Sequence, residues 1–171
     1  MLYNNVWLIG LGNMGYEYSR VLDSLGIIYT AIGRSEKSTT LFTEKTGHKA
    51  HPGGIGIFLQ QKPQLPDAAI ISVNLENLKD TAVQLLNYGV RHILIEKPGV
   101  HHFHEIEELC DLAKEYVAKI MIAYNRRFYA SVMKAREIIK EDGGVTSFHF
   151  EFTEWTNKLF GLYSHKIESL R

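Results

Sequence analysis

A glycine-rich turn directly follows an apolar run near the start of the chain. Residues Val6–Ile9 are all apolar, and Gly10-x-Gly12-x-x-Gly15 comes next. Such a run is typical of a strand buried on both faces of a parallel sheet. In a turn of this kind the first glycine permits a tight reversal, the second lets a pyrophosphate approach the main chain, and the third lets helix and strand pack closely. The pattern predicts a dinucleotide site at the positive end of a helix.

A helix is predicted directly after this turn. Its apolar residues recur at helical spacing, and Gly26 is placed to end it in the left-handed conformation. These apolar residues are Met14, Tyr18, Val21, Leu22 and Leu25. Because a strand precedes the turn and a helix follows it, a ligand-binding turn is favoured over a glycine-rich turn that binds nothing.

The end of the second predicted strand indicates which dinucleotide is bound. Ile27–Ile32 runs into Gly33, Arg34 and Ser35, where an NAD-selective site has an acidic residue for the ribose 2′-hydroxyl. Glu36 is the first acid, one position later. Arg34 would bind a 2′-phosphate and cover adenine, and Ser35 would add a donor, so the sequence favours NADP over NAD. The alternative is that Arg34 is a solvated residue at a helix start.

Strands and helices alternate along the chain, as in an α/β fold with a doubly wound parallel sheet of about six strands. Right-handed crossovers would place the ligand at the carboxyl ends of these strands. Further strands are expected at 67–73, 91–95 and 119–124; further helices are expected at 36–46, 57–61, 78–88 and 104–116, with a glycine-rich link at 51–54. The apolar face of helix 78–88 consists of Leu78, Ala82, Leu85 and Leu86, and Gly89 ends it.

A second motif, Glu96-Lys97-Pro98, follows the strand Arg91–Ile95. Its side chains should reach the sheet edge that also carries the glycine turn. A lysine there can donate or accept a proton, or place positive charge near a developing alkoxide, so Lys97 is the candidate catalytic residue. The alternative is a surface Glu-Lys pair at a strand end.

Composition excludes several classes of function. Nineteen basic residues balance nineteen acidic ones among 171 residues, so no nucleic-acid partner is expected. No apolar stretch has membrane-spanning length and no leader precedes the first strand, which favours a cytoplasmic protein that binds no membrane. The size suits one well-packed domain.

Two other groups of residues carry weaker signals. The single Cys110 lies between Leu109 and Leu112 in a helical pattern and is predicted to be a packed thiol. His101, His102 and His104 lack matching cysteine or acidic ligands, so we expect solvated or substrate-facing histidines and no metal site.

With these motifs the chain resembles the glucose-fructose oxidoreductase, inositol dehydrogenase and MocA (Gfo/Idh/MocA) family over about residues 5 to 154. The resemblance implies an NAD(P)-dependent oxidoreductase of sugars, cyclitols or related alcohols, with a Rossmann domain followed by an α/β substrate domain. It places Lys97 near the nicotinamide and the substrate hydroxyl. The residues that carry it are Gly10-Leu11-Gly12-Asn13-Met14-Gly15, Asp67–Ile71, Glu96-Lys97-Pro98 and Ala123-Tyr124-Asn125-Arg126-Arg127-Phe128.

The predicted site combines the motifs with the resemblance. Lys97 is the catalytic residue, and Asn125, Arg126 and Arg127 would lie at the junction between the domains. The predicted cofactor-binding residues are Gly10, Leu11, Gly12, Asn13, Met14, Gly15, Arg34, Ser35, Asn74, Glu96, Lys97 and Arg126.

The chain departs from the family pattern at two places. Family members have a loop like Thr-Pro-Asn after the fourth strand, with a His a few positions on; here the loop is Val73-Asn74-Leu75, and Leu78 takes the place of the His. They also carry an Asp and a His on a helix of the second domain. This chain has no Asp after Asp142, and His165 is its last histidine.

The end of the sequence predicts the beginning of a second domain. Residues 130–141 suit a helix closed by Gly143 and Gly144, and residues 146–155 alternate like a strand with one aromatic face. We therefore expect a dinucleotide-binding domain at 1–125 and a truncated substrate or oligomerisation domain at 126–171. A strand without neighbours would favour self-association into a homo-oligomer.

Three functions follow from this sequence. The first is part of an oxidoreductase that transfers a hydride between NAD(P) and a sugar, cyclitol or related alcohol, with a small sugar-like molecule as its partner. The second is a catalytically silent dinucleotide-binding module. The third is a folded fragment that binds nothing.

Overall fold

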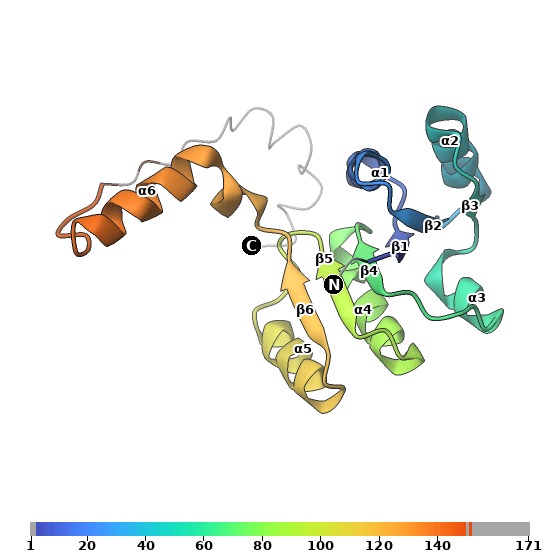
Figure 1. Ribbon diagram of the computed structural model, residues 1–171. Coiled ribbons are helices and arrows are strands. Elements are labelled where there is room, and N and C mark those ends of the chain that lie inside the picture. The colour runs from blue at the N-terminus through green and yellow to red at the C-terminus, as the bar shows by residue number, and fades with distance from the viewer. Residues whose placement is uncertain (1–2, 150, 152–171) are drawn as a thin grey trace, which may run out of the picture. The chain divides into compact units, whose positions relative to one another are not determined.

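Six parallel strands form one sheet in the computed structural model of this protein, which describes residues 3–149 and 151. Their order is β3-β2-β1-β4-β5-β6, so the first strand is central and the chain winds outward in both directions (Figure 1). The strands are β1 (Asn5–Ile9), β2 (Ile28–Ile32), β3 (Ala50–His51), β4 (Ala68–Ile71), β5 (His92–Ile95) and β6 (Lys119–Ile122). This arrangement confirms the predicted doubly wound α/β fold.

Helices cover both faces of this sheet. Helices α1 and α2 lie on one face, and α3, α4 and α5 on the other (Figure 1). The helices of this part are α1 (Asn13–Ser24), α2 (Glu36–Thr46), α3 (Gly54–Gln60), α4 (Leu78–Tyr88) and α5 (His104–Glu115), with a 3-10 helix η1 (Leu75–Asn77) before α4.

Strand β1 shows why both faces need cover. Trp7 and Ile9 belong to the buried cluster under α3, α4 and α5, whereas Val6 and Leu8 belong to the cluster under α1 and α2. All four are at most 3% exposed. An uninterrupted apolar run is what a strand covered on both sides requires.

The strand register aligns the carboxyl ends of the strands. Ile9 pairs with Ile32 and with Ile71, Ile71 pairs with Ile95, and Ile95 pairs with Ile122. The loops that follow these strands therefore leave the sheet at one edge. The glycine turn after β1 and Glu96 after β5 share this edge, as the sequence predicted.

Two elements differ from the sequence prediction in position. Strand β3 was not predicted, because two residues are too few to show a strand pattern, and its second residue, His51, belongs to the predicted link 51–54. Helix α3 begins at Gly54 and not at Ile57. Strands β4 and β6 are also shorter than predicted, since the residues after them already form the loops of the carboxyl edge.

The buried face of α1 also differs from the prediction. Its buried residues are Gly15, Ser19 and Leu22, while Val21 and Leu25 are more than half exposed. Helix α1 packs too closely on the sheet for large side chains at 15 and 19. The left-handed Gly26 after the helix was correctly predicted.

The prediction for Cys110 was wrong, because this thiol is exposed. In α5 only Leu109 is buried, while Leu112 and Tyr116 pack partly against the core. Cys110 follows Leu109 by about 100° around the helix and so faces away from the sheet.

The chain divides into two compact units, residues 1–125 and 126–171. The second contains α6 (Ala130–Glu141), and the 3-10 helix η2 (Asn125–Phe128) begins at the division. Residues 146–149 of the predicted strand are not in strand conformation, and a strand requires a hydrogen-bonded neighbour. Position 150 and residues 152–155 of that prediction lie outside the described residues. The role of the second unit stays a prediction.

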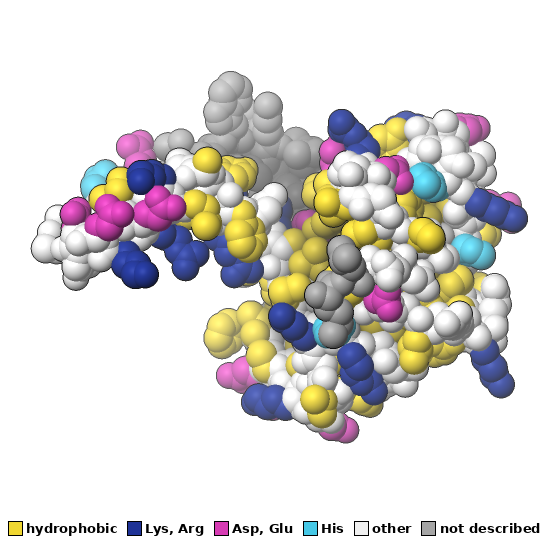
Figure 2. All heavy atoms as spheres, viewed as in Figure 1, with side chains coloured by type: hydrophobic (Ala, Val, Ile, Leu, Met, Phe, Trp, Pro, Cys, Tyr) yellow, Lys and Arg dark blue, Asp and Glu magenta, His cyan; other side chains and the backbone are white. Residues whose placement is uncertain are grey.

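Figure 2 shows one face of the molecule, on which basic and acidic side chains are interspersed among hydrophobic and uncharged ones. Within residues 3–149 and 151, no helix is both long enough and apolar enough to cross a membrane.

Candidate functional site

The first and third glycines of the turn are required by close packing. Gly10 has a φ of +96°, and a Cβ there would lie 2.5 Å from the backbone of Ser72. A Cβ on Gly15 would lie 2.0 Å from the carbonyl oxygen of Gly10. These distances leave no room for side chains, so both glycines hold helix α1 tightly against the end of β1.

Gly12 is different, because nothing among the described residues requires a glycine there. Its φ is −81°, which any residue adopts, and a Cβ would meet no protein atom within 4 Å. The turn therefore leaves open space beside the main chain of its middle glycine. A pyrophosphate that approaches the backbone needs such space.

The beginning of α1 adds the electrostatics that phosphates require. Gly12 is the N-cap residue and supplies no side-chain cap, and the first turn contains no acidic residue. Asn13 and Met14 form this turn, so their backbone N–H groups remain for an anion at the positive end of the helix dipole. The residues present thus fit a dinucleotide phosphate.

A pocket of about 420 Å³ lies at the carboxyl edge of the sheet. It brings together the glycine turn, the end of β2 and the loop after β4, although these segments are far apart in the sequence. Among the predicted residues, its lining includes Gly10, Leu11, Gly12, Arg34, Ser35 and Asn74. Asn13 lines a second pocket of about 310 Å³ between α1 and α2, which also includes Leu11 and Gly12.

Arg34 and Ser35 have different structural roles in the first pocket. Arg34 is exposed, and its side chain forms no hydrogen bond or ion pair within the described part of the chain. Ser35 caps α2: its Oγ accepts a hydrogen bond of 3.3 Å from the amide of Ser38, whose Oγ accepts one of 3.2 Å from the amide of Ser35. Arg34 therefore has a free guanidinium for a ligand, whereas Ser35 already stabilises the helix.

Several lining residues were not predicted from the sequence. Ser72 donates a hydrogen bond of 2.7 Å to the carbonyl of Gly10 and so fixes the turn from the next strand. A polar stripe on α4 also faces the pocket. Its members Asn77, Asp80, Thr81 and Gln84 have helical spacing, a signal that the sequence contained.

Glu96 and Lys97 lie outside the lining of the pocket but at the same sheet edge. The hydroxyl of Tyr18 donates a hydrogen bond of 2.6 Å to Oε1 of Glu96. Burial is the largest cause that raises the pKa of Tyr18 above its ordinary value, and this hydrogen bond is the second. The hydroxyl therefore stays protonated. Lys97 is exposed.

Met14 is not among the residues that line the first pocket. Met14 is exposed in the first turn of α1. Arg126 begins the second unit, in η2, and its contact with the cofactor stays a prediction.

The three histidines after Lys97 contact one another at the surface: the rings of His101 and His102 meet edge to face, and those of His102 and His104 are stacked. The ring centroids of His101 and His102 are 4.3 Å apart, and those of His102 and His104 are 5.6 Å apart. Among residues 3–149 and 151, no three His, Cys, Asp or Glu side chains are grouped as metal ligands.

The strand order 3-2-1-4-5-6, the glycine turn after β1 and the pocket beside it define a dinucleotide-binding domain of the Rossmann type. Comparison with known proteins agrees. The Gfo/Idh/MocA family model, described as an oxidoreductase family with an NAD-binding Rossmann fold, matches residues 4–124. The chain therefore belongs to this oxidoreductase family.

Three proteins to which the chain is similar are named as oxidoreductases or dehydrogenases. An uncharacterized oxidoreductase of Schizosaccharomyces pombe is 29% identical over 129 residues, 73% of this chain. The WlbA dehydrogenase from Chromobacterium violaceum, solved with NADH and UDP-GlcNAcA, has a TM-score of 0.71 at 14% identity over 82% of this chain. A putative NADPH-dependent oxidoreductase from Desulfitobacterium hafniense has a TM-score of 0.71 at 18% identity over 84%.

The chain spans only part of these relatives. It covers 33% of the yeast protein, 40% of the Chromobacterium enzyme and 41% of the Desulfitobacterium protein. At such low identity the two solved structures support the fold alone.

Proposed function

We propose that this chain binds NADP at the carboxyl edge of its sheet, as the cofactor part of an oxidoreductase that acts on an alcohol of the sugar or cyclitol type. The observation that carries the proposal is the open space at Gly12 beside the uncapped start of α1. Gly10 and Gly15 are required by packing, whereas the space at Gly12 leaves room for a group that comes from outside the protein.

The proposed roles follow from the positions of the residues. Gly10, Gly12, Asn13, Met14 and Gly15 would hold the pyrophosphate. In the same pocket Arg34 would bind the 2′-phosphate, with Ser35 as a further donor, and Asn74 would also contact the cofactor. Glu96 and Arg126 stay predicted cofactor-binding residues.

Lys97 is the proposed proton-transfer residue. When bound, a nicotinamide would accept a hydride from the carbon that bears the hydroxyl, or donate one to the carbonyl carbon, while the oxygen on that carbon loses or gains a proton. The Lys97 ammonium can donate that proton, or stabilise negative charge on the oxygen, and in the opposite direction the neutral Lys97 amine can accept the proton. The nucleotide sugar in the Chromobacterium structure supports a sugar-like substrate.

The Gly12 position tests cofactor binding directly. Gly12→Ala adds a methyl group that meets no protein atom within 4 Å, so the variant should fold like the wild type. The methyl would occupy the space of the pyrophosphate, and NADPH affinity should fall about tenfold or more. Gly56→Ala is the matched control, since its added carbon would make only an ordinary contact of 3.5 Å with Gln84. Equal NADPH affinity in both variants would refute the proposal.

Turnover separates the enzyme from a silent module. A panel of polyols and nucleotide sugars would be tested with NADP, with Lys97→Met as the variant that removes the ammonium. Turnover lost in Lys97→Met supports the proposed chemistry, whereas NADPH binding without turnover supports a silent dinucleotide-binding module. If the wild-type chain does not bind NADPH, the result supports the third alternative, a folded fragment that binds nothing. The cytoplasmic location and the homo-oligomer stay predictions.

A further inference from the structure

Lys97 is held in place through its backbone. Its side chain is exposed and forms no hydrogen bond or ion pair with the residues that the structure describes. The position of its ammonium therefore depends on the loop between β5 and α5, residues 96–103. Contacts at both ends of this loop fix it to the rest of the sheet domain.

The first contact is at Glu96, directly before Lys97. Its amide donates a hydrogen bond of 2.8 Å to the carbonyl of Ile71, which continues the sheet ladder. Its carboxylate accepts the 2.6 Å hydrogen bond from Tyr18, a residue of α1 that is 78 positions earlier. This contact joins the helix that follows the glycine turn to the residue before the lysine.

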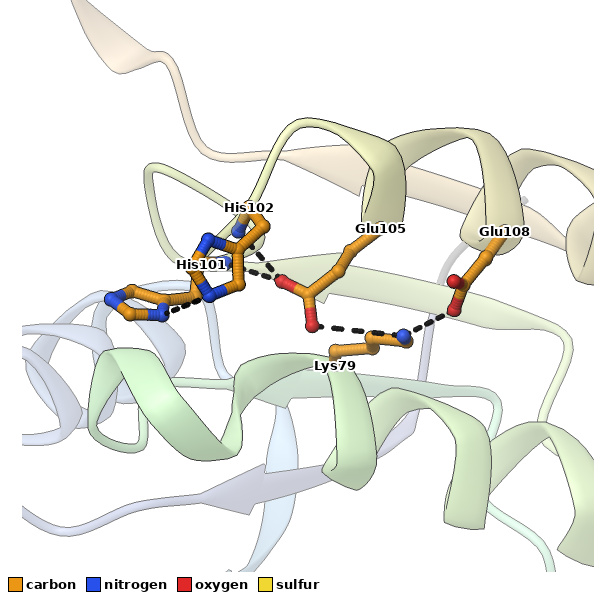
Figure 3. Close-up of polar contacts among 5 residues, drawn as sticks. All are labelled: Lys79, His101, His102, Glu105 and Glu108. Carbon is orange, nitrogen blue, oxygen red and sulfur yellow. Dashed lines mark hydrogen bonds and ion pairs between the residues drawn. The ribbon is translucent and has the colours of Figure 1, made fainter.

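The second contact is at the far end of the loop, where Glu105 of α5 binds two backbone amides (Figure 3). Its Oε2 accepts 2.9 Å and 2.7 Å hydrogen bonds from the amides of His101 and His102. The ammonium of Lys79, on α4, lies 3.6 Å from its other oxygen and also binds Glu108. The hydrogen bond from the His102 amide is the largest of the causes that lower the pKa of Glu105 below its ordinary value. The carboxylate therefore stays ionised.

The middle of the loop is packed against β6. The amide of Gly99 donates a 2.9 Å hydrogen bond to the carbonyl of Glu96, which closes a turn around Lys97. A Cβ on Gly99 would lie 2.5 Å from Cδ1 of Ile122. The hydroxyl of Tyr124 donates to the carbonyl of Pro98 at 3.3 Å. A loop with contacts at both ends and in the middle has little freedom to move its lysine.

We infer that Tyr18 and Glu105 are positioning residues, which hold Lys97 at the nicotinamide end of the cofactor without touching the cofactor themselves. The inference rests on the proposed function. Helix α1 then has two roles: its first turn binds phosphate, and its second turn, through Tyr18, orients Lys97.

The test compares two ligands that share the adenosine end. NADPH contains the nicotinamide, whereas adenosine 2′,5′-bisphosphate does not. Tyr18→Phe should weaken NADPH binding about fivefold and leave the bisphosphate unchanged. Lys97→Met should do the same, and the double variant should lose no more than Lys97→Met alone, because Tyr18 acts through the lysine.

Tyr116→Phe is the matched control, since its hydroxyl also donates a 2.6 Å hydrogen bond, to Asn87. Equal NADPH affinity in Tyr18→Phe and the wild type would overturn the inference, as would equal weakening of both ligands or additive losses in the double variant. Wild-type protein that binds neither ligand would overturn the proposed function as well, so the two failures are distinguishable.

The Glu105→Ala variant tests the inference independently if the Tyr18→Phe variant does not fold. Glu105→Ala frees the amides of His101 and His102 and should show the same selective loss of NADPH affinity. Glu107→Ala is its control, because it removes an exposed acid from the same first turn of α5. Equal NADPH affinity in the Glu105→Ala and Glu107→Ala variants would overturn the role of Glu105.

Discussion

Gly10 and Gly26 both have positive φ values, of +96° and +65°, but only Gly10 is enclosed. A Cβ on Gly10 would lie 2.5 Å from the backbone of Ser72, whereas a Cβ on Gly26 would meet nothing within 4 Å. Gly10→Ala should therefore lower the free energy of unfolding by about 2–3 kcal/mol, and Gly26→Ala by about 1 kcal/mol.

Urea unfolding followed by circular dichroism measures both changes. The difference between the two variants isolates the steric clash from the cost of the left-handed conformation. Equal losses would mean that the backbone of Ser72 moves away freely from the turn, contrary to the close packing described for Gly10.

At the scale of elements, the sequence predicted best where a helix packs through large apolar side chains. In α4 the predicted residues Leu78, Ala82, Leu85 and Leu86 are all buried. The helix α1 was predicted correctly, but of its apolar residues only Leu22 is buried, because a helix packed against a glycine turn buries small residues such as Gly15 and Ser19. Apolar periodicity does not reveal such a face.

The residues that line the candidate site could be predicted only in part. Arg34, Ser35 and Asn74 follow strands, and strand order alone places them at one edge. The α4 residues Asp80 and Gln84 were missed, because a polar stripe on a helix ordinarily indicates a solvated face. Only the fold shows that this stripe lines a pocket.

Asp67 joins the starts of β1 and β4, and this contact should depend on pH. Its Oδ2 accepts hydrogen bonds of 2.8 Å from the amide of Asn4 and 3.0 Å from that of Asn5, which lower the pKa of Asp67 below its ordinary value of 3.8. A carboxyl whose pKa is lower in the folded state stabilises the fold above its unfolded-state pKa. That contribution disappears as the pH falls through the folded-state pKa.

Urea unfolding between about pH 6 and about pH 2 tests this dependence. The wild type should lose more stability over this range than Asp67→Asn, which has no carboxyl to protonate. Asp111→Asn, which removes an exposed carboxylate of α5, should keep the wild-type dependence. Identical curves for the wild type and Asp67→Asn would contradict the role of these hydrogen bonds.

At the scale of the whole molecule, the chain matches its family over the NAD-binding Rossmann fold. The family model matches residues 4–124, which lie within the first compact unit. Substrate choice in such an architecture depends on residues beyond the cofactor domain. The family could be predicted from the four segments that carry the resemblance, and the fold from the alternation of strands and helices, but the substrate could not.

We propose that the pocket binds NADP with Arg34 at the 2′-phosphate. Calorimetric titration of the protein with NADPH and, separately, with NADH measures this preference. The wild type should bind NADPH more tightly, and Arg34→Ala should weaken NADPH about tenfold, with little effect on NADH. Lys37→Ala, which removes a nearby cation outside the pocket lining, should leave both affinities unchanged. Equal binding of NADPH and NADH by the wild type, unchanged in Arg34→Ala, would contradict the account.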